Sequence, residues 1–241
     1  MYSNSSELKK IKDCLDGLSN LLKDRVDLER IHRDNEFNRR MSVVLSSFSD
    51  IETILLRLEK NILKCETIER GIQKRNNNED KEIIQEEGQI LRREEETINR
   101  ENKVDLKALY IFTKIFLDDF TQLIRFIYNW RGIGDRSITQ FYSSLKTYTG
   151  TDHQILLFKK ECFEKIELIN NFVTKYRDNG IIHNQSKHKQ TTWFINDMRG
   201  GVKQVGVKKI GDEQSSVTPI ELITMVREFL CLTTKFINHN I

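Results

Sequence analysis

The sequence predicts an all-α protein, and three observations lead to that prediction. Only one of the 241 residues is proline and 11 are glycine, so residues that break helices are scarce. Apolar residues recur at three- and four-residue spacing over most of the chain, which is the period of an amphipathic helix. The hydrophobic fraction is 38% and the charged fraction is 31%, a composition typical of a soluble protein with a modest core.

Two helices are expected in the first third of the chain. The first starts near Leu8, where apolar residues follow alternating three- and four-residue steps as far as Leu22. The second covers residues 35–69, because apolar residues from Phe37 to Cys65 keep a heptad step over about four repeats. This step predicts a long helix with a partner, which is either another helix of the bundle or, in a dimeric coiled coil, a second chain.

The following residues suggest how the chain is divided. Charged residues dominate 70–103, which is either a solvated helix with a narrow apolar stripe or a linker. From Val104 the sequence is rich in apolar residues and predicts a core helix, interrupted by Asp118, Asp119 and Arg125. We therefore expect a long helical N-terminal region over 1–103 and a helical bundle over 104–241, with helix 35–69 as a candidate to pack into that bundle.

Three more helices and one hairpin complete the prediction. Residues 137–147 fit a short helix, and a longer one is expected from His153. The segments TTWFIND and VKQVGV are separated by turn residues, so a small β-hairpin insertion is expected near 191–208. The last helix has a clear start signal, with Thr218 as N-cap, Pro219 at the first helical position and Glu221 completing a capping box.

Charge and cysteine content narrow the classes of function. The net charge is +3 with no basic tail, which neither predicts nor excludes binding to nucleic acid. The four cysteines are far apart without metal-ligand spacing, and RGIGDRS lacks the spacing of a phosphate-binding loop. No signal peptide or apolar stretch of membrane-spanning length is evident. We therefore expect a cytoplasmic protein with reduced cysteines, no metal, no cofactor and no membrane contact.

The segment KYRDNGIIHN carries the main candidates for chemistry. Arg177 and His183 stand six positions apart, with the helix-stopping pair Asn179 and Gly180 between them. Histidine acts as acid and base near neutral pH, and the arginine guanidinium forms two parallel hydrogen bonds to phosphate oxygens. Together they suffice to cleave RNA without a metal. The alternative is structural, with Arg177 in the last turn of a helix, Gly180 after its end and His183 in a loop.

YRDNGIIHN resembles the signature of the HEPN superfamily, an arginine followed by four to six residues and a histidine. The resemblance implies a helical bundle that acts as a metal-independent endoribonuclease, commonly a homodimer with two motifs facing each other across a cleft. Such proteins act in toxin–antitoxin, phage-defence and RNA-processing systems, so an antitoxin or defence-system partner is implied. Arg177 and His183 would then be catalytic, Asp178 and Asn179 supporting, and Asn184 a weaker supporting candidate.

The sequence departs from the family in two places. The insertion with the predicted hairpin does not belong to a minimal bundle, and Lys187 stands where some HEPN toxins carry a tyrosine that an antitoxin modifies. Weaker candidates for RNA binding follow the motif. His188 has the alternative of an exposed residue and Trp193 that of a buried anchor of the hairpin, while the others give the region a basic character. These candidates are Lys187, His188, Lys189, Trp193 and Arg199. The competing hypothesis for the whole protein is a non-catalytic helical scaffold. It would bind a partner through the heptad helix and its charged extension, and Arg177 and His183 would be structural.

Overall fold

The computed structural model describes residues 4–25, 36–76, 81–134, 136–176, 191–198, 202–209 and 212–240. Side chains are described for 6–20, 36–71, 88–134, 136–173 and 218–240. The described helices are α1 (Asn4–Arg25), α3 (Glu36–Asn76), α4 (Lys81–Tyr128), α5 (Ile138–Thr147), α6 (His153–Tyr176) and α7 (Pro219–Asn240). The strands are β1 (Thr191–Met198), β2 (Val202–Lys209) and β3 (Asp212–Val217). The predicted helical character is thus what the structure has.

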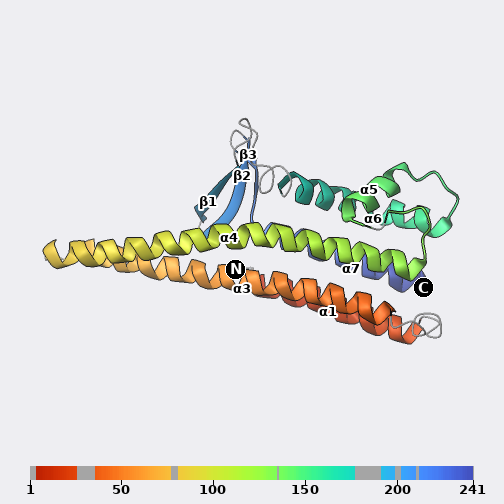
Figure 1. Cartoon of the computed structure of the whole chain (residues 1–241), viewed down its shortest axis with the longest axis horizontal. Coiled ribbons are helices and arrows are strands. Elements are labelled where there is room, and N and C mark those ends of the chain that lie inside the picture. The colour runs from red at the N-terminus through yellow and green to blue at the C-terminus, as the bar shows by residue number, and fades with distance from the viewer. Residues whose placement is uncertain are drawn as a thin grey trace.

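An antiparallel helical hairpin of α3 and α4 forms the long axis of the molecule (Figure 1). The two helices lie side by side, and their joined ends extend beyond the other helices at the left of Figure 1. The heptad positions of α3 face inward, because all of them are buried except Ile62, which is half-buried. The buried positions are Phe37, Met41, Val44, Phe48, Ile51, Leu55, Leu58 and Cys65. Since α4 of the same chain packs against α3, this seam is filled without a second chain.

The charged segment 81–103 and the apolar segment after Val104 form one continuous helix, α4. Of the two readings of the charged segment, the structure has the solvated helix. The narrow apolar stripe of this segment packs against α3 at Ile98, which forms a small second core with Cys65 and Ile68 of α3. The expected boundary between residues 103 and 104 falls inside α4, and one main core draws residues from all six described helices.

Aromatic side chains join the segment just after α4 to α5, α6 and α7. Phe158 of α6 is fully buried, and its ring centroid lies 5.0 Å from those of Trp130 and Phe236. A third ring, Phe141 of α5, lies 6.0 Å away. Edge-to-face aromatic pairs add stabilisation beyond the burial of their area. This cluster therefore fixes α6 against its neighbours.

The acidic residues that interrupt the apolar face of α4 have partners. Asp118 accepts hydrogen bonds from Lys114 Nζ at 2.5 Å and from the backbone N–H of Ile138 at 2.7 Å. Asp119 accepts from Ser47 Oγ at 2.5 Å. Burying a carboxylate costs free energy unless such bonds are made. Here they tie α4 to the start of α5 and to the middle of α3.

The cap residues predicted for the last helix are confirmed. Glu221 Oε2 accepts from the backbone N–H of Thr218 at 2.7 Å, and Thr218 Oγ1 accepts from the backbone N–H of Glu221 at 3.3 Å. These reciprocal bonds are those of a capping box, and α7 begins at Pro219. The short helix α5 is capped in a similar way, because Ser137 Oγ accepts from the backbone N–H of Gln140.

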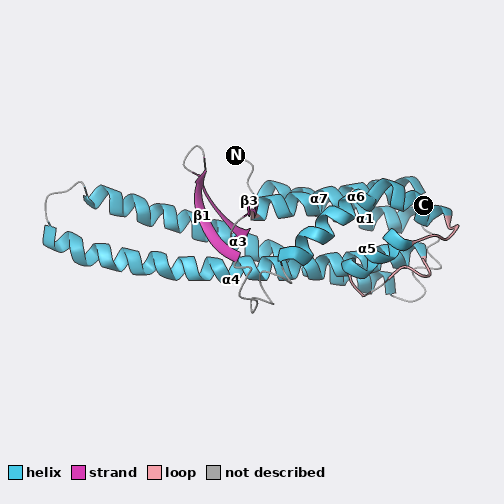
Figure 2. Cartoon of the chain, turned by 90° about the horizontal axis from the view of Figure 1, so that it is seen from above, coloured by secondary structure: helices cyan, strands magenta, loops and turns pink. Residues whose placement is uncertain are grey.

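A three-stranded antiparallel sheet precedes α7, in the order β1-β2-β3. Strands β1 and β2 occupy the segment of the expected hairpin, with Trp193 opposite Val207. β3 was not predicted, because DEQSSV lacks alternating apolar residues. Its pairing with β2 has an irregularity between Val207 and Lys209. The sheet stands on the side of the α3–α4 hairpin (Figures 1 and 2), and β2 contacts α3.

Candidate functional site

The predicted catalytic motif lies outside the described residues. This applies to both catalytic candidates, to the supporting residues and to four of the weaker RNA-binding candidates. They are Arg177, Asp178, Asn179, His183, Asn184, Lys187, His188, Lys189 and Arg199. The fifth weak candidate, Trp193, belongs to β1, where its backbone pairs with Val207. Its side chain is not among those described, so base stacking and burial both stay open as roles.

The structure does describe the helix that leads into the motif. α6 ends at Tyr176, and Arg177 is the next residue of the chain. The last described turns of α6 are held by the core, because Val173 is fully buried. The Phe172 ring stacks on that of Tyr110 in α4, with 6.1 Å between the centroids. The chain therefore enters the motif from a helix that is packed into the core.

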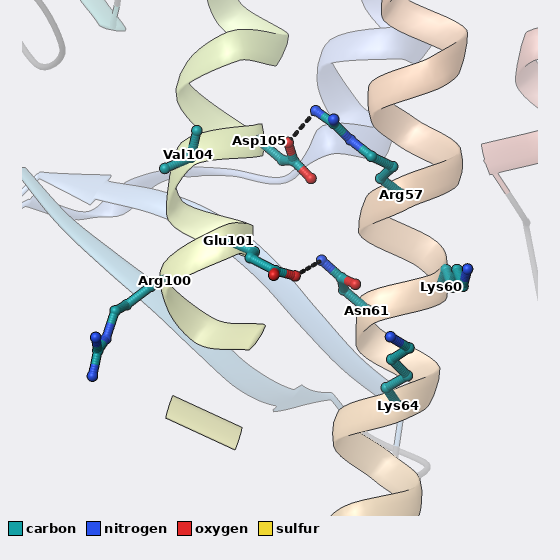
Figure 3. Close-up of a pocket in the computed structure, with 8 residues that line it drawn as sticks. All are labelled: Arg57, Lys60, Asn61, Lys64, Arg100, Glu101, Val104 and Asp105. Atoms are coloured by element: carbon teal, nitrogen blue, oxygen red, sulfur yellow. Dashed lines mark hydrogen bonds and ion pairs between the residues drawn. The ribbon is translucent and has the colours of Figure 1, made fainter. Parts of the chain in front are cut away.

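A basic groove lies between α3 and α4, away from the motif in sequence. It has a volume of about 580 Å³ and is lined by eight residues (Figure 3). These are Arg57, Lys60, Asn61 and Lys64 of α3 and Arg100, Glu101, Val104 and Asp105 of α4. Four of the side chains are cationic and two are acidic, so the groove favours an anion.

Two interactions fix the wall of the basic groove. The Arg57 guanidinium forms an ion pair with Asp105, whose side chain is only 7% exposed. One turn away, Asn61 Nδ2 donates to Glu101 Oε2 at 3.5 Å. Burial raises the pKa of the Asp105 carboxyl, although the nearby Arg57 charge opposes that rise. The Arg57 guanidinium is thus held in place by Asp105, while more than half of the Arg57 side chain stays exposed.

The remaining cations differ in how they face the groove. In Figure 3 the Lys64 side chain lies beside Asn61, whereas Lys60 and Arg100 point away from the gap between the helices. Arg100 approaches Glu96 at 3.7 Å. No carboxylate among the described residues pairs with Lys64. Arg57 and Lys64 are therefore the two cations best placed to contact a bound phosphate.

Helical spacing brings these groups together. Arg57, Asn61 and Lys64 are four and seven positions apart and share one side of α3, and Glu101 and Asp105 are four apart on α4. Sequence reasoning missed this site because charged residues on a helix usually form a solvated face. The spacing was visible in the sequence, but the antiparallel alignment of α3 with α4 was not.

Two further properties describe the part of the chain that the structure covers. Among the described residues, no group of three or more histidine, cysteine or acidic side chains is suited to hold a metal ion. Within the same residues, no helix is long and apolar enough to cross a membrane.

Comparison with known proteins identifies no relative of this chain. No family model matches the chain, and no curated protein or solved structure is significantly similar to it. Two features of the chain carry the most chemistry, the segment YRDNGIIHN and the basic groove.

Proposed function

We propose that this protein is a metal-independent endoribonuclease of HEPN type. The observation that supports this most is the placement of the first motif residue in the chain. Arg177 directly follows α6, near whose end Phe172 packs against Tyr110 of α4 and Val173 is buried in the core. A catalytic constellation works best when it is carried by a rigid element. α6 is such an element, and Asn179 and Gly180 then provide residues at which the chain can turn.

The proposed chemistry needs only side chains of this chain. His183 acts as a general base and takes the proton of a ribose 2′-hydroxyl, whose oxygen attacks the adjacent phosphorus. The bond from phosphorus to the 5′-oxygen breaks, and this oxygen takes up a proton from solvent to become a 5′-hydroxyl. The other fragment ends in a 2′,3′-cyclic phosphate. Arg177 stabilises the charge that develops on the phosphate oxygens. DNA is not cleaved, because it lacks the 2′-hydroxyl.

Binding of the RNA backbone is a separate part of the proposal. The basic groove offers Arg57 and Lys64 to phosphate oxygens, and contacts of this kind give affinity without sequence preference. By the HEPN resemblance, two copies of the chain face each other with one motif each. The same resemblance implies work in a toxin–antitoxin or phage-defence system, with an antitoxin or defence protein as regulator.

The test is a cleavage assay with purified protein, single-stranded and structured RNA, and EDTA. We expect the wild type to cut RNA, and Arg177→Ala and His183→Ala to lose at least about 100-fold in rate, which is typical for removal of a general base or charge stabiliser. His153→Ala is the matched control, because this histidine is exposed at the start of α6. Wild-type protein that is folded but leaves all the RNA intact would contradict the proposal.

A non-catalytic interaction protein is the second candidate function. It is favoured by the end of the α3–α4 hairpin, which extends beyond the bundle (Figure 2). Four apolar side chains of this hairpin are at least half exposed: Leu56, Leu63, Ile90 and Val104. Exposed apolar side chains on a projecting hairpin are available for contact with a partner.

This candidate predicts that the wild type dimerises through the hairpin and does not cut RNA. We expect the double variant Leu63→Lys, Ile90→Lys to sediment as a monomer. Leu168→Lys, at a similarly exposed position of α6, should leave the dimer intact. A dimer that persists in the double variant would contradict this function.

A further inference from the structure

Two cysteines that are 217 positions apart in sequence meet in the fold. Cys14 of α1 and Cys231 of α7 have their Sγ atoms 2.8 Å apart. Both are free thiols. Their separation in the sequence gave no sign of this contact. A disulfide bond is about 2.0 Å long, so the two sulfur atoms need to approach by less than about 1 Å to become bonded.

The helices that carry the two thiols are docked in a defined register. α1 and α7 lie alongside each other, and the buried Glu7 carboxylate pairs with Arg227 Nη1 at 2.5 Å. Ile11 and Leu15 of α1 are buried in the main core together with Leu230 of α7. Because this contact surrounds the cysteines, their proximity is maintained by packing rather than by the thiols.

The two thiols differ in access to solvent, and both differ from the other cysteines. Cys231 is exposed and Cys14 is half-buried, whereas Cys65 and Cys162 are buried. A small oxidant therefore reaches Cys231 first. Burial and the neighbouring Cys231 raise the pKa of the Cys14 thiol to about 12, so Cys14 is the slower nucleophile.

We infer that Cys14 and Cys231 form a reversible disulfide that fastens α1 to α7, with a low-molecular-weight disulfide as oxidant. The Cys231 thiolate attacks one sulfur of the oxidant, forms a mixed disulfide and releases one small thiolate. The Cys14 thiolate then attacks Cys231 Sγ and expels the second small thiolate. Two electrons pass from the protein thiols to the oxidant, and the two thiol protons end on the small thiols.

The consequence is a covalent link between the first and last helices. The ring closed by this bond contains all of α3, α4, α5 and α6, together with the sheet and the 177–183 segment. A cross-link that closes so long a loop restricts the unfolded chain strongly. The oxidised protein should therefore resist thermal unfolding more than the reduced protein.

The test treats the full-length protein with oxidised glutathione, blocks free thiols with an alkylating agent and measures intact mass and non-reduced peptides. We expect the oxidised protein to carry two alkyl groups fewer than reduced protein that is alkylated in the same way. We also expect a peptide pair that joins Cys14 to Cys231, and a rise in Tm that dithiothreitol reverses. In Cys14→Ser the reaction should stop with glutathione attached to Cys231. Cys65→Ala is the control and should close the bond as the wild type does.

Other products would overturn the inference. These are a wild type in which glutathione stays on Cys231 without closure, a bond between Cys231 and any cysteine other than Cys14, or a cross-link between two chains. The wild-type peptide map decides the question even if a variant fails to fold.

Discussion

Phe158 is the residue whose removal should loosen α6 most. Its ring is fully buried and contacts three other rings, those of Trp130, Phe236 and Phe141, at centroid distances of 5.0, 5.0 and 6.0 Å. Trp130 lies two residues after the end of α4, Phe141 belongs to α5 and Phe236 to α7. Phe158→Ala removes the ring that joins all of them and leaves a cavity between four elements.

The expected loss follows from the burial and from the ring contacts. Replacing a buried phenylalanine by alanine costs about 3–5 kcal/mol, and three lost aromatic pairs place this site at the upper end, at about 4–5 kcal/mol. For a chain of this length each kcal/mol corresponds to about 2–4 °C, so the Tm should fall by roughly 8–20 °C. Phe158→Leu keeps most of the apolar volume and should lose only about 1–2 kcal/mol.

The assay is urea unfolding followed by circular dichroism, together with calorimetry. Leu156→Ala is the control, because this side chain lies on the same helix and is 42% exposed. It should change stability by less than about 1 kcal/mol. If Phe158→Ala were no more destabilised than Leu156→Ala, the ring would not hold α6, and the reasoning would be refuted.

Three further perturbations test other parts of the structure. Thr218→Ala removes the capping hydroxyl of α7 and should lower the free energy of unfolding by about 1 kcal/mol, while Thr218→Ser should restore it; equal stability of all three proteins in urea would contradict the capping role. Burial raises the pKa of Asp119, so its contribution to stability is fully present below the usual aspartate pKa and is lost as the pH rises through the raised value. Asp119→Asn should thus gain stability relative to wild type as the pH is raised from about 3 to 7 in thermal scans, and a relative loss would contradict that sign. Lys64→Gln should weaken binding of a single-stranded RNA and reduce the slope of log affinity against log salt concentration by about 0.7. Lys160→Gln, at an exposed position of α6, should change neither quantity. An unchanged slope for Lys64→Gln would show that Lys64 does not contact the RNA backbone.

Local signals in the sequence were enough to predict the helices and several of their ends. The start of α7 could be predicted from Thr218, Pro219 and Glu221, because a capping box and a proline at the first helical position depend only on neighbouring residues. The buried seam of α3 could be predicted in the same way, because the heptad spacing is a property of one continuous segment. Periodicity did not reveal that the charged segment after Lys81 joins the core segment in one helix, because a solvated helix and a linker have similar composition.

Contacts between distant residues were the part that the sequence could not supply. Cys14 and Cys231 look isolated in the sequence, and only the docking of α1 on α7 brings them together. Arg57 and Asp105 form the wall of the basic groove because α3 and α4 are antiparallel with one particular alignment. Residue spacing fixes which groups share one helix face, but the register between two helices is set by the packing of the whole core.

The most direct test of the proposed function is the chemistry of the cut RNA ends. Wild-type protein and His183→Ala are incubated side by side with one RNA in EDTA, and the fragments are examined by mass spectrometry. The proposed mechanism predicts fragments with a 2′,3′-cyclic phosphate and a 5′-hydroxyl from the wild type, and intact RNA with the variant. Fragments with a 5′-phosphate, or equal cleavage by His183→Ala, would contradict it.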